Sequence, residues 1–389
     1  MIKVFIGPNG YGKTTKLESI KQNLINSGVN VNEILFLESE ILLLEEVKDT
    51  KDNTKTMEYI LTELLETVPV ITSRTNYEQA IDTEITSNIA NVNTIIDDIL
   101  SLNGMTRTGD FISVSTTKTY KNLVKINQND VKKKMGSGQR MHLLLELVNK
   151  SSKQYLFIDE PEKYSHPSML NKTANLLNVL SLTKDIYIAT HSPKLLSMLD
   201  LELDNISILN DTTYSEKNLD FIGSIGSYTT HGTLLSANPG TAKSSSYFNV
   251  INLKDNIKRL HYRDFMEALF ANTVYLVEVV NDELFIKKML LDNGKYYGDY
   301  YIFPVYGKHH MMIFTYILSG LSIKVKLFFD EDNTNPINTS TNTLLSGFDH
   351  FMFSPNIEDI FHFPRGSKYN TVAFLDLLDL LTIPATYDI

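Results

Sequence analysis

Short apolar runs separated by longer segments of mixed polarity are spread along this chain of 389 residues. They are rich in β-branched and aromatic side chains, which is typical of buried strands. In the N-terminal half these runs lie at 1–6, 33–37, 155–158 and 186–189. Because they alternate with segments compatible with helix, we expect an α/β fold.

A different pattern fills the region from about 40 to 105, where apolar residues recur at three- and four-residue steps. The clearest stripe consists of Ile81, Ile85, Ile89, Val92, Ile95, Ile96 and Ile99. This spacing predicts helices with one apolar face, inserted into the α/β pattern. Two interpretations stay open: an ordinary core face, or a short antiparallel helical arm for dimer or partner contact that turns near Pro69 and Thr72. No heptad run is long enough for an extended coiled coil.

The periodicity starts again after a linker-like stretch of small and polar residues at 238–247. Beyond it, strands are predicted at 273–278, 301–305 and 323–329, and helical runs at 284–291 and 310–318. This alternation predicts a second, small parallel sheet. We therefore expect two domains, 1–245 with the helical insertion and 246–389.

The amino-acid composition excludes some kinds of functional site and argues against some classes of protein. The sequence contains no cysteine, which excludes disulfides, thiolate metal sites and thiol nucleophiles. Its net charge of −10 argues against a surface coated with nucleic acid, although a local basic groove is compatible with it. No signal peptide or apolar stretch long enough to span a bilayer is visible, so we expect a cytoplasmic protein without membrane contact.

A phosphate-binding motif follows the first apolar run directly. Residues 7–15 read Gly-Pro-Asn-Gly-Tyr-Gly-Lys-Thr-Thr, and a glycine, four residues and Gly-Lys-Thr form a P-loop. The glycines let backbone N–H groups converge on phosphate oxygens. Lys13 would bring its charge to the β- and γ-phosphates, and the Thr14 hydroxyl would bind Mg²⁺. The nucleotide-binding residues predicted here are Asn9, Gly10, Gly12, Lys13, Thr14 and Thr15.

Two further strands end in residues that suit phosphoryl transfer. Asp159 and Glu160 follow the run at 155–158; Asp159 would hold Mg²⁺, and Glu160 would polarise the attacking water. His191 ends the run at 186–189 and would sense the γ-phosphate. A small-residue loop at 135–139, read as Met-Gly-Ser-Gly-Gln, precedes a predicted helix and is a second candidate anion site.

In the second domain, carboxylates gather where predicted strands end. They are Glu278, Asp282, Asp330, Asp332 and Glu358. Hard oxygen ligands of this kind suit Mg²⁺ or Mn²⁺, and paired ions can activate water against a phosphodiester. The alternative is that these residues are solvated strand-end and helix-cap acids, a common role of Asp and Glu.

Taken together, the motifs resemble the Walker A, signature, Walker B and switch-histidine elements of ABC-type ATPases, in the RecF/SMC/OLD branch. The resemblance implies ATP and Mg²⁺ as cofactors, with hydrolysis carried by Glu160 and His191. It also implies a homodimer in which the loop with Ser137, Gly138 and Gln139 of one chain caps the γ-phosphate on the other.

The second domain resembles a TOPRIM domain as it occurs in OLD-family nucleases. The resemblance rests on Glu278, on Asp330-x-Asp332 and on Gly307-Lys308 after the second strand. It implies catalytic Glu278, Asp330 and Asp332, with Asp282 and Glu358 completing the metal site, and Lys368 as a stand-in for a catalytic lysine.

Two functions follow from the resemblance. In the first, the nucleotide state controls a metal-dependent nuclease in the same chain, acting on DNA rather than RNA in anti-phage defence. In the second, the chain is an ATPase sensor or scaffold with a degenerate TOPRIM domain, and it controls a separate effector protein. Val279 favours the second, because the family usually has glycine there. The carboxylate set favours the first.

Overall fold

The structure, a computed structural model, describes most of the chain in two compact units. The described residues are 1–38, 77–111, 125–126, 129–130, 135–163, 166–209, 216–227, 249–295, 299–332, 336–364 and 371–380. Contacts divide the chain into Met1–Tyr214 and Ser215–Ile389. The expected boundary at 245/246 lies outside the described residues and stays a prediction.

The first unit is built on a parallel sheet with β1 near its centre. Within this unit the strand order is β2-β5-β6-β1-β7, and all of these strand pairs are parallel. The strands are β1 (Ile2–Ile6), β2 (Ile34–Leu37), β5 (Tyr155–Asp159), β6 (Asp185–Thr190) and β7 (Ile206–Leu209). The first four match the predicted strands, which confirms the α/β class.

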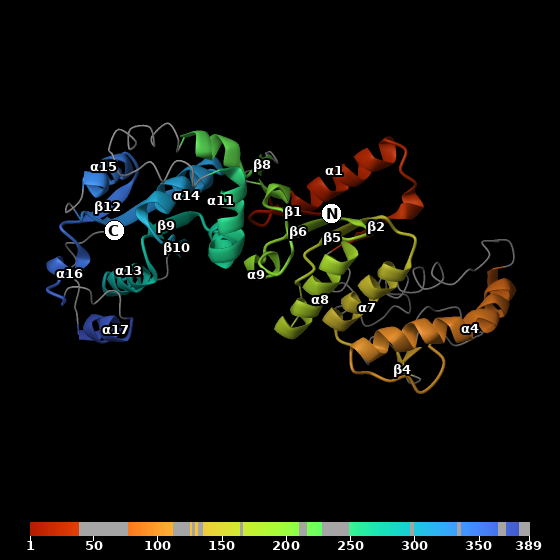
Figure 1. Cartoon of the computed structure of the whole chain (residues 1–389). Coiled ribbons are helices and arrows are strands. Elements are labelled where there is room, and N and C mark those ends of the chain that lie inside the picture. Colours follow the sequence, from red (N-terminus) through yellow and green to blue (C-terminus); the bar gives the residue numbers. More distant parts are fainter. Residues whose placement is uncertain are drawn as a thin grey trace. The chain divides into compact units, whose positions relative to one another are not determined.

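Helices cover both faces of this sheet (Figure 1). α1 (Lys13–Asn26) lies on one side, where Leu17 packs with Phe5 and Phe157. α7 (Ser137–Lys150) and α8 (Pro167–Leu180) lie on the other side. Shorter elements are α9 (Pro193–Leu196), the 3₁₀ helices η1 (Val31–Glu33) and η3 (Leu203–Asn205), and the antiparallel pair β3 (Lys125–Ile126) and β4 (Asn129–Asp130).

The register of the strands brings three of the predicted motifs to one edge of the sheet. β1 pairs with β6 so that Ile6 lies opposite Thr190. β5 pairs with β6 so that Asp159 lies opposite Ala189. Since all three strands run in the same direction, the segments that follow them leave the sheet side by side. This is the edge at which open α/β sheets bind ligands.

The helical insertion is described in its second part, as the helix α4 (Tyr77–Leu102). Val92, Ile96 and Ile99 of the predicted stripe are buried, as an ordinary core face requires. The Arg107 guanidinium pairs with Asp97 at 2.7 Å and fixes the turn that follows the helix. The region 40–76, with the turn expected near Pro69 and Thr72, lies outside the described residues.

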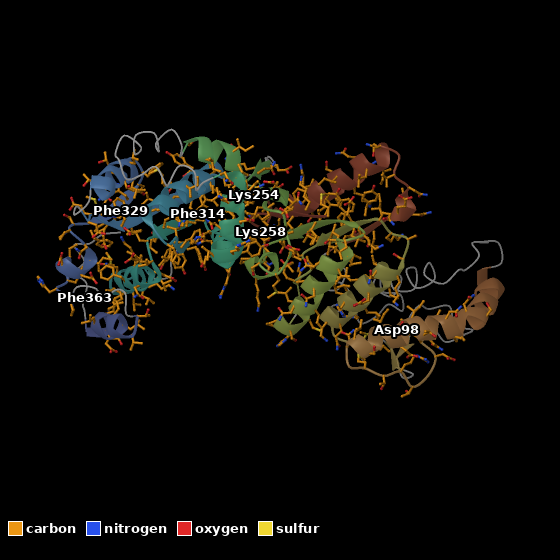
Figure 2. All side chains as sticks on the ribbon, viewed as in Figure 1. Asp98, Lys254, Lys258, Phe314, Phe329 and Phe363 are labelled. Atoms are coloured by element: carbon orange, nitrogen blue, oxygen red, sulfur yellow. The ribbon has the colours of Figure 1, made fainter. Side chains whose placement is uncertain are left out.

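The second unit is built on a four-stranded parallel sheet in the order β10-β9-β11-β12. Its strands are β9 (Thr273–Val277), β10 (Tyr300–Pro304), β11 (Lys324–Asp330) and β12 (His350–Phe353). Three of them match the prediction; the edge strand β12 was not predicted. Phe314 and Phe329 lie in the interior of this unit (Figure 2).

Helices connect the strands of the second unit in alternation, as the sequence predicts, and others that the sequence analysis did not predict precede β9 or follow β12. The helices of this unit are α11 (Val250–Asn256), the π-helix η4 (Ile257–His261), α12 (Tyr262–Ala268), α13 (Val280–Asp292), α14 (Lys308–Gly320), α15 (Pro336–Leu345), α16 (Ile357–Ile360) and α17 (Thr371–Leu380). Within the described part of the chain, no helix combines the length and apolar character needed to cross a membrane.

Candidate functional site

The P-loop connects the central strand β1 to α1, as the motif predicts. Gly7, Gly10 and Gly12 have φ angles of 147°, 84° and 79°, in the region where side chains cause strain. At Gly7 a Cβ atom would also lie 2.5 Å from the carbonyl oxygen of Leu209. α1 starts without a side-chain cap, so its first N–H groups have no capping side chain to satisfy them. This end of a helix stabilises an anion.

Lys13 is the one buried residue of an otherwise accessible loop, with 6% of its surface exposed. Its ammonium donates to the carbonyl oxygens of Gly7 at 2.8 Å and Pro8 at 3.1 Å. Burial lowers the pKa of Lys13, although the nearby carboxylates of Asp159 and Glu160 act in the opposite direction. The predicted ligands Asn9, Gly10, Thr14 and Thr15 are exposed. The positive charge is therefore held inside the loop, at its phosphate-facing turn.

Thr14 and Asp159 meet although they are far apart in the sequence. The Thr14 hydroxyl donates to Asp159 Oδ2 at 2.7 Å, and Asp159 is only 5% exposed. Burial raises the pKa of Asp159, while the Thr14 hydrogen bond lowers it. A hydroxyl and a carboxylate beside a phosphate site are the hard oxygen ligands with which proteins hold a nucleotide's Mg²⁺. The residues present therefore fit this ion.

Glu160 is set in an unusual backbone conformation, with φ of 49°. Its N–H donates to the Ala189 carbonyl at 2.8 Å. Its carboxylate lies 3.2 Å from Lys163 Nζ and 3.1 Å from His191 Nδ1. Burial by itself would raise the pKa of Glu160, but these two partners outweigh it and the pKa is lowered. The side chain is therefore ionised at neutral pH, as a residue that orients or deprotonates water must be.

Glu162 is a site residue that the sequence analysis did not assign. Its Oε1 accepts from the Thr190 hydroxyl at 2.6 Å and from the His191 N–H at 3.1 Å, and it lies 3.4 Å from His191 Nδ1. Burial raises the pKa of this carboxyl group, although its hydrogen bonds lower it. The sequence signal that could have identified it is a third acid within residues 159–162, Asp-Glu-Pro-Glu. Glu162 holds the backbone from which His191 reaches Glu160.

We expect Glu162→Ala to lower ATP turnover by about tenfold to a hundredfold, because His191 loses the contacts that orient it. Glu162→Gln retains an acceptor for Thr190 and His191, so its turnover is expected to lie between wild type and alanine. Both rates are measured as phosphate release at saturating ATP. Equal losses in the two variants would show that the charge of Glu162, and not its positioning role, is what turnover requires.

The signature-like loop lies at the start of α7. Gly136 precedes α7, and its N–H donates to Gln139 Oε1 at 3.0 Å. Among the described residues, no hydrogen bond or ion pair joins Gly138 or Gln139 to the P-loop or to Asp159. The side chain of Ser137 lies outside the described atoms. The described contacts of this loop are therefore local to the start of α7.

In the second unit, three of the five predicted acidic residues lie around Lys308 at the start of α14, two of them through their carboxylates and Asp330 through its backbone carbonyl. Lys308 Nζ lies 3.6 Å from Glu278 Oε1 and 3.8 Å from Asp332 Oδ2. It also donates to the backbone carbonyl of Asp330. Glu278 Oε1 accepts the Asp330 N–H at 3.3 Å. The ends of β9 and β11 thus meet as predicted, with a lysine between them.

The other two predicted metal ligands have local roles. Asp282 Oδ2 accepts the Val279 N–H at 3.1 Å and so caps α13, which is the alternative interpretation of this residue. Glu358 is buried in the first turn of α16. In the part of the chain that the structure describes, no group of three His, Asp or Glu side chains could hold a metal ion. Lys368 lies outside that part.

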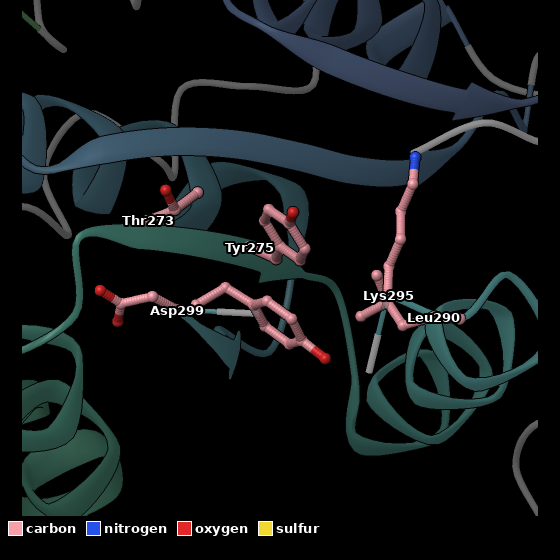
Figure 3. Close-up of a pocket in the computed structure, with 7 residues that line it drawn as sticks. Thr273, Tyr275, Leu290, Lys295 and Asp299 are labelled. Carbon is pink, nitrogen blue, oxygen red and sulfur yellow. The ribbon is translucent and has the colours of Figure 1, made fainter. Parts of the chain in front are cut away.

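The pocket in this unit lies at the opposite edge of the sheet (Figure 3). It has a volume of about 500 Å³. Thr273 and Tyr300 line it where β9 and β10 begin, whereas Glu278 follows the end of β9. Tyr275 and Tyr300 stack with 5.0 Å between ring centroids, and Lys295 also lines it. The acidic cluster is therefore not part of this cavity.

Comparisons with known proteins find similarity in structure alone. No family model and no curated protein matches the chain. A metal-chelate type ABC transporter in an inward-facing conformation is 14% identical over 56% of this chain and 71% of its own, with a TM-score of 0.33. The dimeric bacterial ABC transporter cassette MJ0796 is 12% identical over 57% and 85%, with a TM-score of 0.31.

An SMC head bound to the C-winged helix domain of ScpA gives a similar result. It is 12% identical over 56% of this chain and 90% of its own, with a TM-score of 0.31. TM-scores this low assign neither a family nor an activity. The argument for function therefore rests on the contacts of this chain's own residues.

Proposed function

We propose that the first unit binds ATP with Mg²⁺ and hydrolyses it at the edge formed by β1, β5 and β6. The observation that carries this proposal is the meeting of Thr14 with Asp159 and of Glu160 with His191. These pairs join three separate segments of the chain. A P-loop by itself would support binding only; an ionised carboxylate beside it supports hydrolysis.

Each residue has a role that follows from its contacts. The P-loop N–H groups and the α1 N-terminus bind the phosphates, and Lys13 exchanges its carbonyl partners for phosphate oxygens. Thr14 and Asp159 would hold Mg²⁺, which would supply positive charge beside the transferred phosphoryl group. Glu160 accepts the hydrogen bond of the attacking water, and His191 keeps its carboxylate oriented.

A homodimer completes this site. In this proposal the loop at 135–139 of one chain reaches the phosphates that a second chain binds. The loop lies at the start of α7, and the N-terminal end of a helix favours an anion. Hydrolysis per chain is then expected to rise with protein concentration, as the dimer forms.

For the second unit, the contacts of Lys308 favour a control role over cleavage. In this role the nucleotide state changes how the unit engages a separate effector protein. The nuclease in the same chain, with DNA as substrate and Mn²⁺ or Mg²⁺ on the carboxylates, is the alternative. As they are arranged, the carboxylates do not fit a metal ion, because an ammonium lies among them. Anti-phage defence stays a prediction of the resemblance.

Two assays test these proposals separately. Phosphate release from ATP, with and without Mg²⁺, tests the first unit and is expected to require the metal. Plasmid cleavage with Mg²⁺ or Mn²⁺ tests the second, comparing wild type with Asp330→Ala/Asp332→Ala, with and without ATP. We expect hydrolysis without cleavage. Cleavage by wild type that the double variant lacks would establish the nuclease and reject the control role.

A further inference from the structure

Lys308 is a buried cation in the place where the resemblance implies a metal. It follows Gly307, whose φ is 130°, at the first position of α14, and it is 8% exposed. Besides the contacts with Glu278, Asp330 and Asp332, its ammonium donates to Asn342 Oδ1 at 3.1 Å. The ring centroid of Phe329 lies 5.8 Å from it. Five groups from three segments thus surround one side-chain nitrogen.

These contacts satisfy the ammonium well. It has three protons to donate; the Asp330 carbonyl and Asn342 Oδ1 accept hydrogen bonds, and the carboxylates of Glu278 and Asp332 lie at ion-pair distance. A buried lysine without such partners would lose its charge or destabilise the fold. The aromatic face of Phe329 adds a further favourable contact for a cation. These surroundings therefore suit a cation.

The same arrangement opposes a divalent ion. Glu278 Oε1 is shared between Lys308 and the Asp330 N–H, and Asp330 Oδ1 accepts the Ile357 N–H at 3.0 Å. A metal at the centre of the cluster would displace these donors and would lie beside a positive charge in a desolvated site. It would also need ligand atoms that already have partners.

We propose that the Lys308 ammonium is the resident cation of this cluster and takes the place of a divalent metal. With Lys308 present, Glu278 and Asp332 bind no Mg²⁺ or Mn²⁺. Without Lys308, the same carboxylates form a metal site. This inference concerns the second unit alone and does not depend on ATP hydrolysis in the first.

The test is Mn²⁺ binding to the nucleotide-free full chain, measured by electron paramagnetic resonance of the free ion. The variants are Asp332→Asn, Lys308→Met and Lys308→Met/Asp332→Asn. All of them share the P-loop, so differences between them report on the second unit. Methionine approximates the length of lysine without its charge. Folding is checked by circular dichroism.

We expect wild type and Asp332→Asn to bind the same number of Mn²⁺ ions at every concentration up to millimolar. Lys308→Met is expected to gain one site that is roughly tenfold or more tighter than any wild-type site, and the double variant to lose it. A folded Lys308→Met chain that gains no site would overturn the proposal.

The comparison of wild type with Asp332→Asn tests whether Lys308 takes the place of a divalent metal, even if Lys308→Met does not fold. The Asp332 side chain is 38% exposed, so its conversion to asparagine is expected to leave the fold intact. Equal Mn²⁺ binding by these two proteins supports Lys308 as the resident cation. A site that wild type has and Asp332→Asn lacks would show that the metal binds beside Lys308, contrary to the proposal.

Discussion

Glu160→Gln is expected to lower the turnover of ATP by about 10²- to 10⁴-fold while leaving ATP binding nearly unchanged. Glutamine retains the size of the side chain and its contact with His191, but it cannot accept a proton from water. Lys163 and His191 lower the pKa of Glu160, so the wild-type carboxylate stays ionised into mildly acidic solution. Phosphate release and equilibrium binding of ATP measure the two effects separately.

The matched control for this variant is Glu18→Gln, on the exposed face of α1. It removes the same charge from the same unit, so its turnover should equal that of wild type. A Glu160→Gln chain with turnover within about twofold of wild type would remove Glu160 from the catalytic role.

Lys13→Ala is expected to weaken ATP binding by roughly 10- to 10²-fold. Hydrogen bonds from a charged donor contribute about 1.5–3 kcal/mol each, which sets this range. Lys13 Nζ already lies in the turn of the loop, on the Gly7 and Pro8 carbonyls, so little reorganisation is needed for it to meet phosphate. Isothermal titration with a non-hydrolysable ATP analogue in the presence of Mg²⁺ measures the affinity.

Lys194→Ala, in the exposed first turn of α9, is the control for loss of positive charge. Its affinity should stay that of wild type. Equal weakening in Lys13→Ala and Lys194→Ala would mean that the general field of the protein, and not the P-loop lysine, attracts the nucleotide.

The candidate site at the edge formed by β1, β5 and β6 could be predicted because its residues directly follow the ends of these strands. Parallel strands in one sheet end on the same side, so residues that follow β1, β5 and β6 must approach one another whatever separates them in sequence. Thr14 and Asp159 were each predicted from their motifs to bind Mg²⁺, and the direction of the strands explains why they meet. The sequence could not predict Glu162, whose role depends on the Thr190 hydroxyl and the His191 N–H, two partners that no sequence pattern specifies.

The sequence predicted where the acidic residues of the second unit lie, but not that the ammonium of Lys308 lies among them. Glu278, Asp330 and Asp332 lie together for the same reason of strand direction. Lys308 was noted by resemblance only, since a single lysine after a strand does not reveal whether its ammonium points to solvent or into the sheet edge. Asp282 similarly follows a general preference of acids for the first turn of a helix, which a spacing argument cannot distinguish from ligation.

The elements that the sequence analysis did not predict are short or lack a clear pattern of apolar and polar residues. β12 has four residues, and only Phe353 is fully buried, so the run has no clear alternation. α15 is composed largely of asparagine and threonine, residues with little helix preference, and its place is decided by packing. In both cases tertiary contacts outweigh the local signal.

ATP hydrolysis by the unmodified chain is the most direct test of the central claim, that the edge formed by β1, β5 and β6 is a working phosphoryl-transfer site. Phosphate release would be followed at saturating ATP over a series of protein concentrations, with Mg²⁺ and after its removal with a chelator. The account predicts many turnovers per chain, a rate per chain that rises with protein concentration, and complete loss without Mg²⁺. A folded chain that releases no phosphate at any concentration would contradict it.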